Sequence, residues 1–87
     1  MIAKRRRSSL EIIANILEVA SKPEGVGKTH IMYKSNLSNK LVQEYLNFVV
    51  EKKLIDVTMR SKRRFKISER GREYLKKFRE LETILAV

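Results

Sequence analysis

Apolar residues follow helical spacing through residues 10–20, the first apolar-rich stretch of the chain. Ser8 and Glu11 form the pattern of a capping box, in which two side chains satisfy free N–H groups at a helix start. The predicted helix is apolar nearly all round, so a small domain has to enclose it between its own layers or against a partner chain. Residues 21–27, with Pro23 and two glycines, then predict a loop.

Two amphipathic stretches separated by a short polar turn come next. Thr29 is the expected cap of the first, which carries apolar residues 31–33 and ends near residues 35–36. Ser38 is the expected cap of the second, which runs to about residue 52 and keeps its apolar side chains on one side at helical spacing. Two short helices joined by such a turn are typical of a helix-turn-helix.

Beyond Leu54 the period of the apolar positions changes to two. Residues 55–59 alternate between apolar and polar, residues 64–67 do so again, and a basic segment joins them, which predicts an antiparallel hairpin with a basic tip. Ser68 is the expected cap of a last helix. The large apolar residues of that helix repeat at spacings of four, three and four, as in a coiled-coil seam, at Tyr74, Phe78, Leu81 and Leu85.

Length and composition limit what these elements can build. With 87 residues the chain buries only roughly 60–65% of its unfolded surface, enough for one modest core but not for a second lobe that holds a cofactor. We therefore predict one α+β domain, mostly α. The absence of Cys excludes disulfides and thiolate metal sites and favours a cytoplasmic location. No apolar run approaches the ~18 residues that span a bilayer, so no membrane partner is expected.

Charge is the feature that points to a partner. The net charge is +10, and the excess is confined to residues 4–7 and residues 60–66, whereas residues 8–59 balance six basic against six acidic residues. The like charges within each cluster repel one another unless an anion binds against them. Charge that serves only solubility would be distributed over the whole surface. Two basic segments that flank a neutral domain favour contact with the phosphates of nucleic acid.

The second helix of the predicted helix-turn-helix carries an exposed row formed by Lys40, Gln43 and Asn47. Amide side chains bond bidentately to adenine and lysine reaches guanine acceptors, although any solvated helix carries such residues as well. Glu44 on the same face repels phosphate, which favours sequence reading over purely non-specific binding.

Other predicted contacts come from the helix start, the hairpin tip and a basic N-terminal arm. A helix start offers N–H groups to a phosphate, and basic side chains at a hairpin tip enter or straddle the minor groove. A basic arm is expected to lie free until it enters a groove. The predicted DNA-contacting residues are Lys4, Arg5, Arg6, Arg7, Ser38, Asn39, Lys40, Gln43, Asn47, Arg60, Lys62, Arg63 and Arg64.

The sequence predicts neither a catalytic site nor a metal site. Residues 25–29 (Gly-Val-Gly-Lys-Thr) look like the end of a phosphate-binding P-loop, but such a loop needs a glycine where Lys22 stands. His30 has no ligand-type neighbour and no Ser or Cys nucleophile to serve. We therefore expect no enzyme activity, no cofactor, no metal site and no small-molecule substrate.

The order helix, helix-turn-helix, basic hairpin, helix is that of a winged helix, and several residues resemble one family. The chain resembles the small archaeal winged-helix DNA-binding proteins, some chromatin-associated and some regulatory, that dimerise through a C-terminal helix. The residues that carry the resemblance are 28–38 (Lys-Thr-His-Ile-Met-Tyr-Lys-Ser-Asn-Leu-Ser), 45–46, 54–55 and 68–75. This family usually has glycine where Lys53 stands, at a left-handed helix end, so Lys53 either costs about 1 kcal/mol or the helix ends differently.

The resemblance implies a homodimer joined through Tyr74, Phe78, Leu81 and Leu85, which otherwise pack only on the first helix of the same chain. We divide the chain into a basic N-terminal arm (1–7), a winged helix-turn-helix domain with a two-stranded basic wing (8–67) and a C-terminal dimerisation helix (68–87). We expect a double-stranded DNA-binding transcriptional regulator, cytoplasmic and nucleoid-associated. The alternatives are a non-specific nucleoid (chromatin) protein and a protein-interaction adaptor, while the scarcity of aromatic residues argues against RNA binding.

Overall fold

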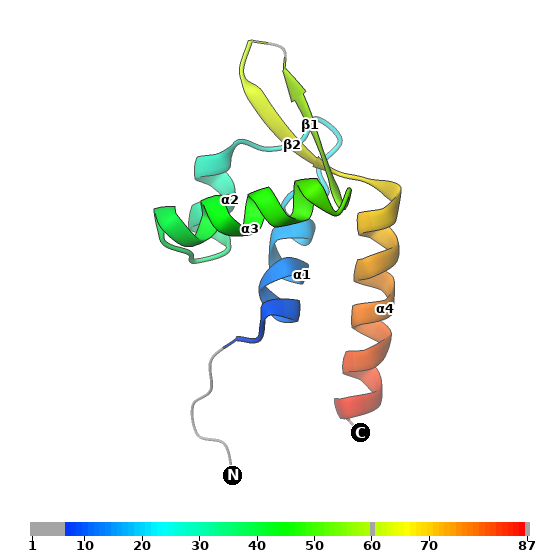
Figure 1. The fold of residues 1–87 in the computed structure, drawn as a ribbon. Coiled ribbons are helices and arrows are strands. Elements are labelled where there is room, and N and C mark those ends of the chain that lie inside the picture. The colour runs from blue at the N-terminus through cyan, green and yellow to red at the C-terminus, as the bar shows by residue number, and fades with distance from the viewer. Residues whose placement is uncertain (1–6, 60, 87) are drawn as a thin grey trace.

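The structure is a computed structural model that describes residues 7–59 and 61–86. Its elements follow in the order α1 (Ser9–Val19), α2 (Lys28–Lys34), α3 (Asn39–Glu51), β1 (Ile55–Met59), β2 (Arg63–Ile67) and α4 (Glu69–Ala86). In Figure 1, α1 lies between α4 and the α2–α3 pair, and the β1–β2 hairpin projects from one end of the molecule. The predicted fold class is confirmed: α+β, mostly helical, with a two-stranded antiparallel hairpin and a C-terminal helix.

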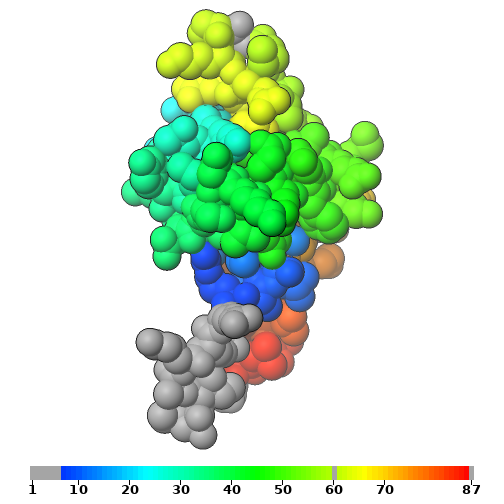
Figure 2. Space-filling view, turned by 60° about the vertical axis from the view of Figure 1, so that its left-hand side comes forward, coloured from blue at the N-terminus to red at the C-terminus, as the bar shows by residue number. Residues whose placement is uncertain are grey.

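The molecule is elongated, with principal extents of 48, 26 and 20 Å. Figure 2 shows the hairpin (yellow) at one end, α2 (cyan) and α3 (green) across the middle, and α1 (blue) with the C-terminal part of α4 (red) toward the other end. The basic hairpin and the apolar C-terminal residues therefore lie far apart, so that a partner bound at one end leaves the other end accessible.

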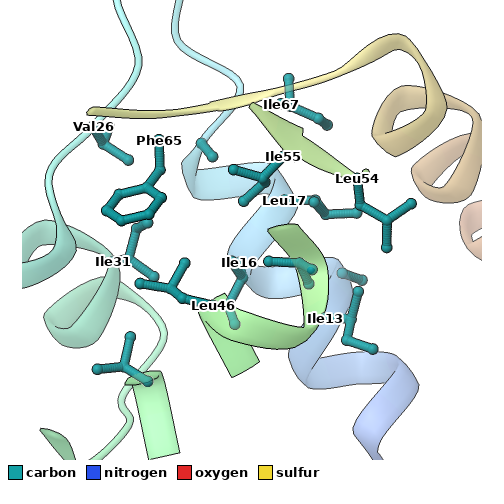
Figure 3. Close-up of a cluster of buried hydrophobic side chains, with 14 of the residues drawn as sticks. Ile13, Ile16, Leu17, Val26, Ile31, Leu46, Leu54, Ile55, Phe65 and Ile67 are labelled. Carbon is teal, nitrogen blue, oxygen red and sulfur yellow. The ribbon is translucent and has the colours of Figure 1, made fainter. Parts of the chain in front are cut away.

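The core forms where α1 is enclosed by α2, α3, the hairpin and α4. Ile16 and Leu17 of α1 and Ile31 of α2 have no exposed surface. Figure 3 shows Phe65 of β2 pointing from the hairpin toward Ile31, with Leu46 of α3 and Ile16 beyond it. The chain's own layers thus enclose most of the apolar surface of α1, which is the first of the two arrangements that its pattern allows.

Side-chain caps begin three helices at the predicted residues. The Ser8 hydroxyl accepts from the Glu11 N–H at 3.2 Å while the Glu11 carboxylate accepts from the Ser8 N–H at 3.0 Å, which completes the capping box. The hydroxyls of Ser38 and Ser68 likewise accept backbone N–H groups at the starts of α3 and α4. Each cap satisfies a donor that the first helical turn leaves without an intrahelical partner.

The predicted cap of α2 is wrong. Gly27 is the N-cap residue, no side chain caps the helix, and Thr29 lies inside it. The reason is a long-range contact, because Val26 pairs with Phe65 of β2 through two backbone hydrogen bonds of 2.9 and 2.7 Å. This bridge keeps the chain extended up to Gly27, so the helix starts directly after it.

α4 begins against the start of the hairpin and then packs along α1. The Ser68 N–H donates to the Leu54 carbonyl at 3.0 Å, and Gly71 is buried directly against the same carbonyl. Leu75 follows one turn later in the core. α4 is the longest element, yet neither it nor any other helix in the described part of the chain is both long and apolar enough to cross a membrane.

The apolar residues of α4 divide into two groups. Tyr74 and Phe78 are half-buried and stack at a centroid distance of 6.3 Å, and the Tyr74 hydroxyl donates to the Leu10 carbonyl of α1 at 2.8 Å. Burial raises the pKa of the Tyr74 phenol above its ordinary value. Leu81 and Leu85 are exposed. The first half of the predicted seam therefore packs on α1 of the same chain, and the second half faces solvent.

Lys53 ends α3 in the left-handed conformation, with a φ of 63°. A side chain is strained there by its own backbone, whereas glycine is not. We expect Lys53→Gly to raise the free energy of unfolding by roughly 0.5–1 kcal/mol. Urea denaturation monitored by circular dichroism measures this, with Lys53→Ala as the control that removes the same charge but keeps the Cβ. Equal stability of the two variants would contradict the expected strain.

Candidate nucleic-acid interface

A groove of about 400 Å³ lies between one flank of α3 and the hairpin. Its floor is apolar, because the core residues Leu46 and Phe65 reach it, and its rim is polar, with Gln43 and Asn47 on α3 and Arg63 on β2. Figure 2 shows the hairpin directly above α2 and α3 on this side of the molecule. This α3–wing groove is the place where the predicted row on α3 meets the hairpin.

Burial along α3 places the predicted row on the solvent side. Three apolar residues of the helix face the core at spacings of four and three. Lys40 and Asn47 are exposed, and Gln43 is half-buried at the edge of the groove. Glu44 and Glu51 are exposed on the same outward side, so this surface attracts an anion only where neighbouring cations outweigh them.

Lys28, the first residue of α2, joins Gln43 and Asn47 in a hydrogen-bonded relay. Its ammonium donates to Gln43 Oε1 at 2.7 Å, and Gln43 Nε2 donates to Asn47 Oδ1 at 3.0 Å. Spacing along the sequence does not place Lys28 in the site, because the contact joins residues 15 positions apart. Lys28 belongs to the P-loop-like segment and to the segment that carries the family resemblance, and neither pattern indicates a contact with α3.

The cations of the hairpin lie on two opposite faces. Arg63 pairs with Met59 across the strands and turns toward the α3–wing groove, where its guanidinium stands 5.4 Å from the centre of the Phe65 ring. Arg64 pairs with Thr58 and turns the other way, because successive side chains of a strand alternate. The sequence shows these cations as one cluster, and the strand register separates them.

The outward face of the hairpin forms a second groove, of about 680 Å³, against the loop that precedes α2. Lys62, Arg64 and Lys66 line it together with Glu24 of that loop. Of the predicted wing residues that the structure describes, only Arg63 therefore shares a groove with the row on α3. Lys62 and Arg64 are placed to reach an anion on the far side of the hairpin.

Arg7 is already engaged within the chain. Its guanidinium donates to Asn15 Oδ1 at 2.9 Å and to the carbonyls of Ser35 and Asn36 at 2.7 and 3.2 Å. These carbonyls lie where α2 ends, so Arg7 ties the beginning of α1 to the turn between α2 and α3. DNA contact by Arg7 stays a prediction, and the structure gives this residue an anchoring role that the sequence analysis does not foresee.

The remaining predicted residues add helix-start and arm contacts. Ser38 and Asn39 are exposed at the start of α3. Lys4, Arg5, Arg6 and Arg60 lie outside the described residues. Within residues 7–59 and 61–86, no group of three His, Cys, Asp or Glu side chains is placed to hold a metal ion. The described cations and amides of the predicted site offer positive charge and hydrogen-bond donors, with the carboxylates of Glu44 and Glu51 beside them.

The family of the chain follows from comparison with known proteins. A family model described as winged helix-turn-helix matches residues 6–86. The chain belongs to the winged helix-turn-helix family. In winged helix-turn-helix terms α2 and α3 are the helix-turn-helix, the β1–β2 hairpin is the wing, and α3 is the helix beside it. Comparison with curated proteins finds no match.

Two solved structures are similar to this winged helix-turn-helix chain. One is Sso10a-2, described as a DNA-binding protein from Sulfolobus solfataricus, with a TM-score of 0.78 and 23% identity over 92% of this chain and 83% of that one. The other, a protein of unknown function from Listeria innocua Clip11262, gives a TM-score of 0.70 and 17% identity over 79% of this chain and 50% of that one. Both likenesses agree with the winged-helix fold that the sequence resemblance implies.

Proposed function

We propose that this winged helix-turn-helix protein binds double-stranded DNA, with α3 in the major groove and the wing on the backbone or in the minor groove. The α3–wing groove carries the proposal, because Gln43 and Asn47 of α3 and Arg63 of the wing bring hydrogen-bond donors together there, and Lys28 of α2 donates to Gln43. A solved structure with the same fold is described as a DNA-binding protein, which supports the proposal.

The charges on α3 and the wing favour selective over uniform binding. Cations stand at the start of α3 and on the wing, whereas Glu44 and Glu51 lie on the outward side of α3 between and beyond the amides. Phosphate contacts are thus expected from the wing and the helix start, and base contacts from the middle of α3. We therefore propose a nucleoid-located transcriptional regulator in preference to a non-specific nucleoid protein.

Salt dependence of binding to a random-sequence duplex pool tests the proposal. Phosphate contact by a dimer predicts that log affinity falls with log salt at a slope of roughly −5 to −9 between about 50 and 300 mM salt. Sequences enriched from the pool and bound at least ~100-fold more tightly indicate a regulator. A steep slope without enrichment indicates a nucleoid protein. No binding at about 50 mM salt would contradict DNA binding and favour the adaptor alternative.

We also propose that the protein forms a homodimer through the C-terminal part of α4. Leu81 and Leu85 are 47% and 75% exposed, and with Leu10 and Phe78 they line a groove of about 500 Å³ between α4 and the start of α1. A second copy that places its own α4 here would remove these leucines from water. The surface lies at the opposite end of the molecule from the wing, so both interactions can occur together.

A charge placed on this surface is expected to separate the protomers. We expect Leu85→Glu to shift sedimentation equilibrium from dimer to monomer at micromolar concentration while circular dichroism stays unchanged, because the side chain is exposed in the protomer. Thr83→Glu is the matched control, since it adds the same charge on the opposite side of α4. Dimers that persist in Leu85→Glu would exclude this surface as the interface.

A further inference from the structure

We infer that Lys28 determines the base preference of α3, by fixing which atoms the amides of Gln43 and Asn47 turn outward. This inference rests on the proposed DNA binding and makes it more specific. Lys28 lies on α2 and Gln43 and Asn47 on α3, and the relay joins them through contacts of 2.7 and 3.0 Å. A lysine on the neighbouring helix thereby becomes a specificity-determining residue.

The chemistry of the ammonium group sets the direction of the whole relay. A lysine ammonium has donors and no acceptor, so the Gln43 atom that faces it has to be the carbonyl oxygen Oε1. The Gln43 nitrogen Nε2 consequently lies on the other side and requires an acceptor, which is Asn47 Oδ1. The Asn47 nitrogen Nδ2 is then the end of the relay. Reversing either amide would place donor against donor.

What the relay presents to a bound duplex is therefore a set of donors. Both amide oxygens accept hydrogen bonds within the relay, and Asn47, the exposed member, ends it with the two hydrogens of Nδ2. Arg63 on the facing rim of the groove adds further donors, whereas Glu51 supplies an acceptor in the same groove. Glu44 is a second acceptor on the outward side of α3.

Donors at the outward end of the relay discriminate between the purines. Guanine presents two acceptors in the major groove, N7 and O6, whereas adenine presents one acceptor and one donor. The bidentate amide contact to adenine expected from the sequence uses the amide oxygen together with the nitrogen, and in the relay each amide oxygen already accepts one hydrogen bond, so an adenine amino group has to share that oxygen. The geometry thus favours guanine opposite Asn47, with a carboxylate of α3 available to the amino group of a paired cytosine.

The test is selection from a random duplex pool, followed by competition between duplexes that differ at one position. The full chain is expected to enrich sites with a guanine whose replacement by adenine, or by 7-deazaguanine, weakens binding roughly tenfold. Lys28→Met removes the donor and keeps the aliphatic stem, so the guanine preference should fall to near unity. Lys28→Arg, which keeps a donor-only cation, should retain it. Asn47→Asp turns an oxygen outward and should transfer the preference to cytosine.

A control variant distinguishes the orienting effect of Lys28 on the amides from the attraction of its positive charge to DNA. Lys22→Met removes the same charge from the exposed loop before α2, so it should lower affinity for the random pool about as much as Lys28→Met and leave the guanine preference intact. An unchanged preference in Lys28→Met, or enriched sites without a required guanine, would overturn the inference while leaving DNA binding in place. Absence of binding to any duplex at low salt would instead remove the proposed function itself.

Discussion

Replacing Gly71 by alanine is expected to lower the free energy of unfolding by roughly 3 kcal/mol. An added Cβ would overlap the Leu54 carbonyl oxygen and come within 2.7 Å of Ile67 Cγ1. The carbonyl cannot withdraw freely, because it accepts the Ser68 N–H at the junction of the hairpin and α4. The helix therefore has to shift, which also disturbs the packing of Leu75 in the core.

Chemical denaturation of Gly71→Ala measures this effect, and Gly27→Ala is the control. At Gly27 the nearest atom to an added Cβ is Arg64 Nη1 at 4.0 Å, and the backbone φ of −85° suits any residue. We expect the control to change stability by less than about 1 kcal/mol, through the weaker N-cap preference of alanine. Similar losses in both variants would show that the close approach of α4 to Leu54 is not the cause.

Neutralising three cations together, as in Lys40→Gln/Lys62→Gln/Arg63→Gln, is expected to weaken DNA binding about 100-fold for each bound protomer at constant salt. Each lost phosphate contact costs on the order of 1 kcal/mol, and each loss also flattens the salt slope by about one per protomer. The side chains are exposed at the start of α3 and on the wing, so folding should be unaffected. Fluorescence anisotropy with a random-sequence duplex, repeated over a salt series, measures both quantities.

A control variant removes the same number of positive charges from α4, away from the proposed DNA-binding surface. Arg72, Lys76 and Lys77 line an exposed, charged groove on α4 with Glu69 and Glu73. Changing these three cations to glutamine should reduce affinity only a few-fold, because it alters the net charge but not the proposed contact surface. If both triple variants bind equally weakly, the interaction depends on total charge and the proposed orientation on DNA is wrong.

Local patterns predict most of the fold because local interactions begin and end most elements. Ser8, Ser38 and Ser68 cap the helices at the expected positions, and the change of period at Leu54 marks the start of the wing. Lys53 adopts the left-handed conformation, which is the first of the two alternatives that the family resemblance leaves open. The exception is the start of α2, which depends on the pairing of Val26 with β2, a contact that no local pattern encodes.

The candidate site is less predictable, because contacts between distant residues decide its details. Helical spacing is enough to place Lys40 and Asn47 on the exposed side of α3. It cannot show that Lys28 reaches Gln43, or that Arg7 binds carbonyls 28 and 29 residues away. The same holds for the wing, where the strand register and not the spacing of charges separates its cations onto two faces.

The bridge between Val26 and Phe65 couples the position of the wing to the start of α2. One edge of β2 pairs with β1, and its other edge forms backbone hydrogen bonds with Val26, which lies two residues before Lys28. On the proposed binding mode, we expect a wing that tilts to follow a curved or widened duplex to move Lys28 and, through it, the amides of α3. Two duplexes with identical contacted bases but different stiffness are therefore expected to bind with different affinities.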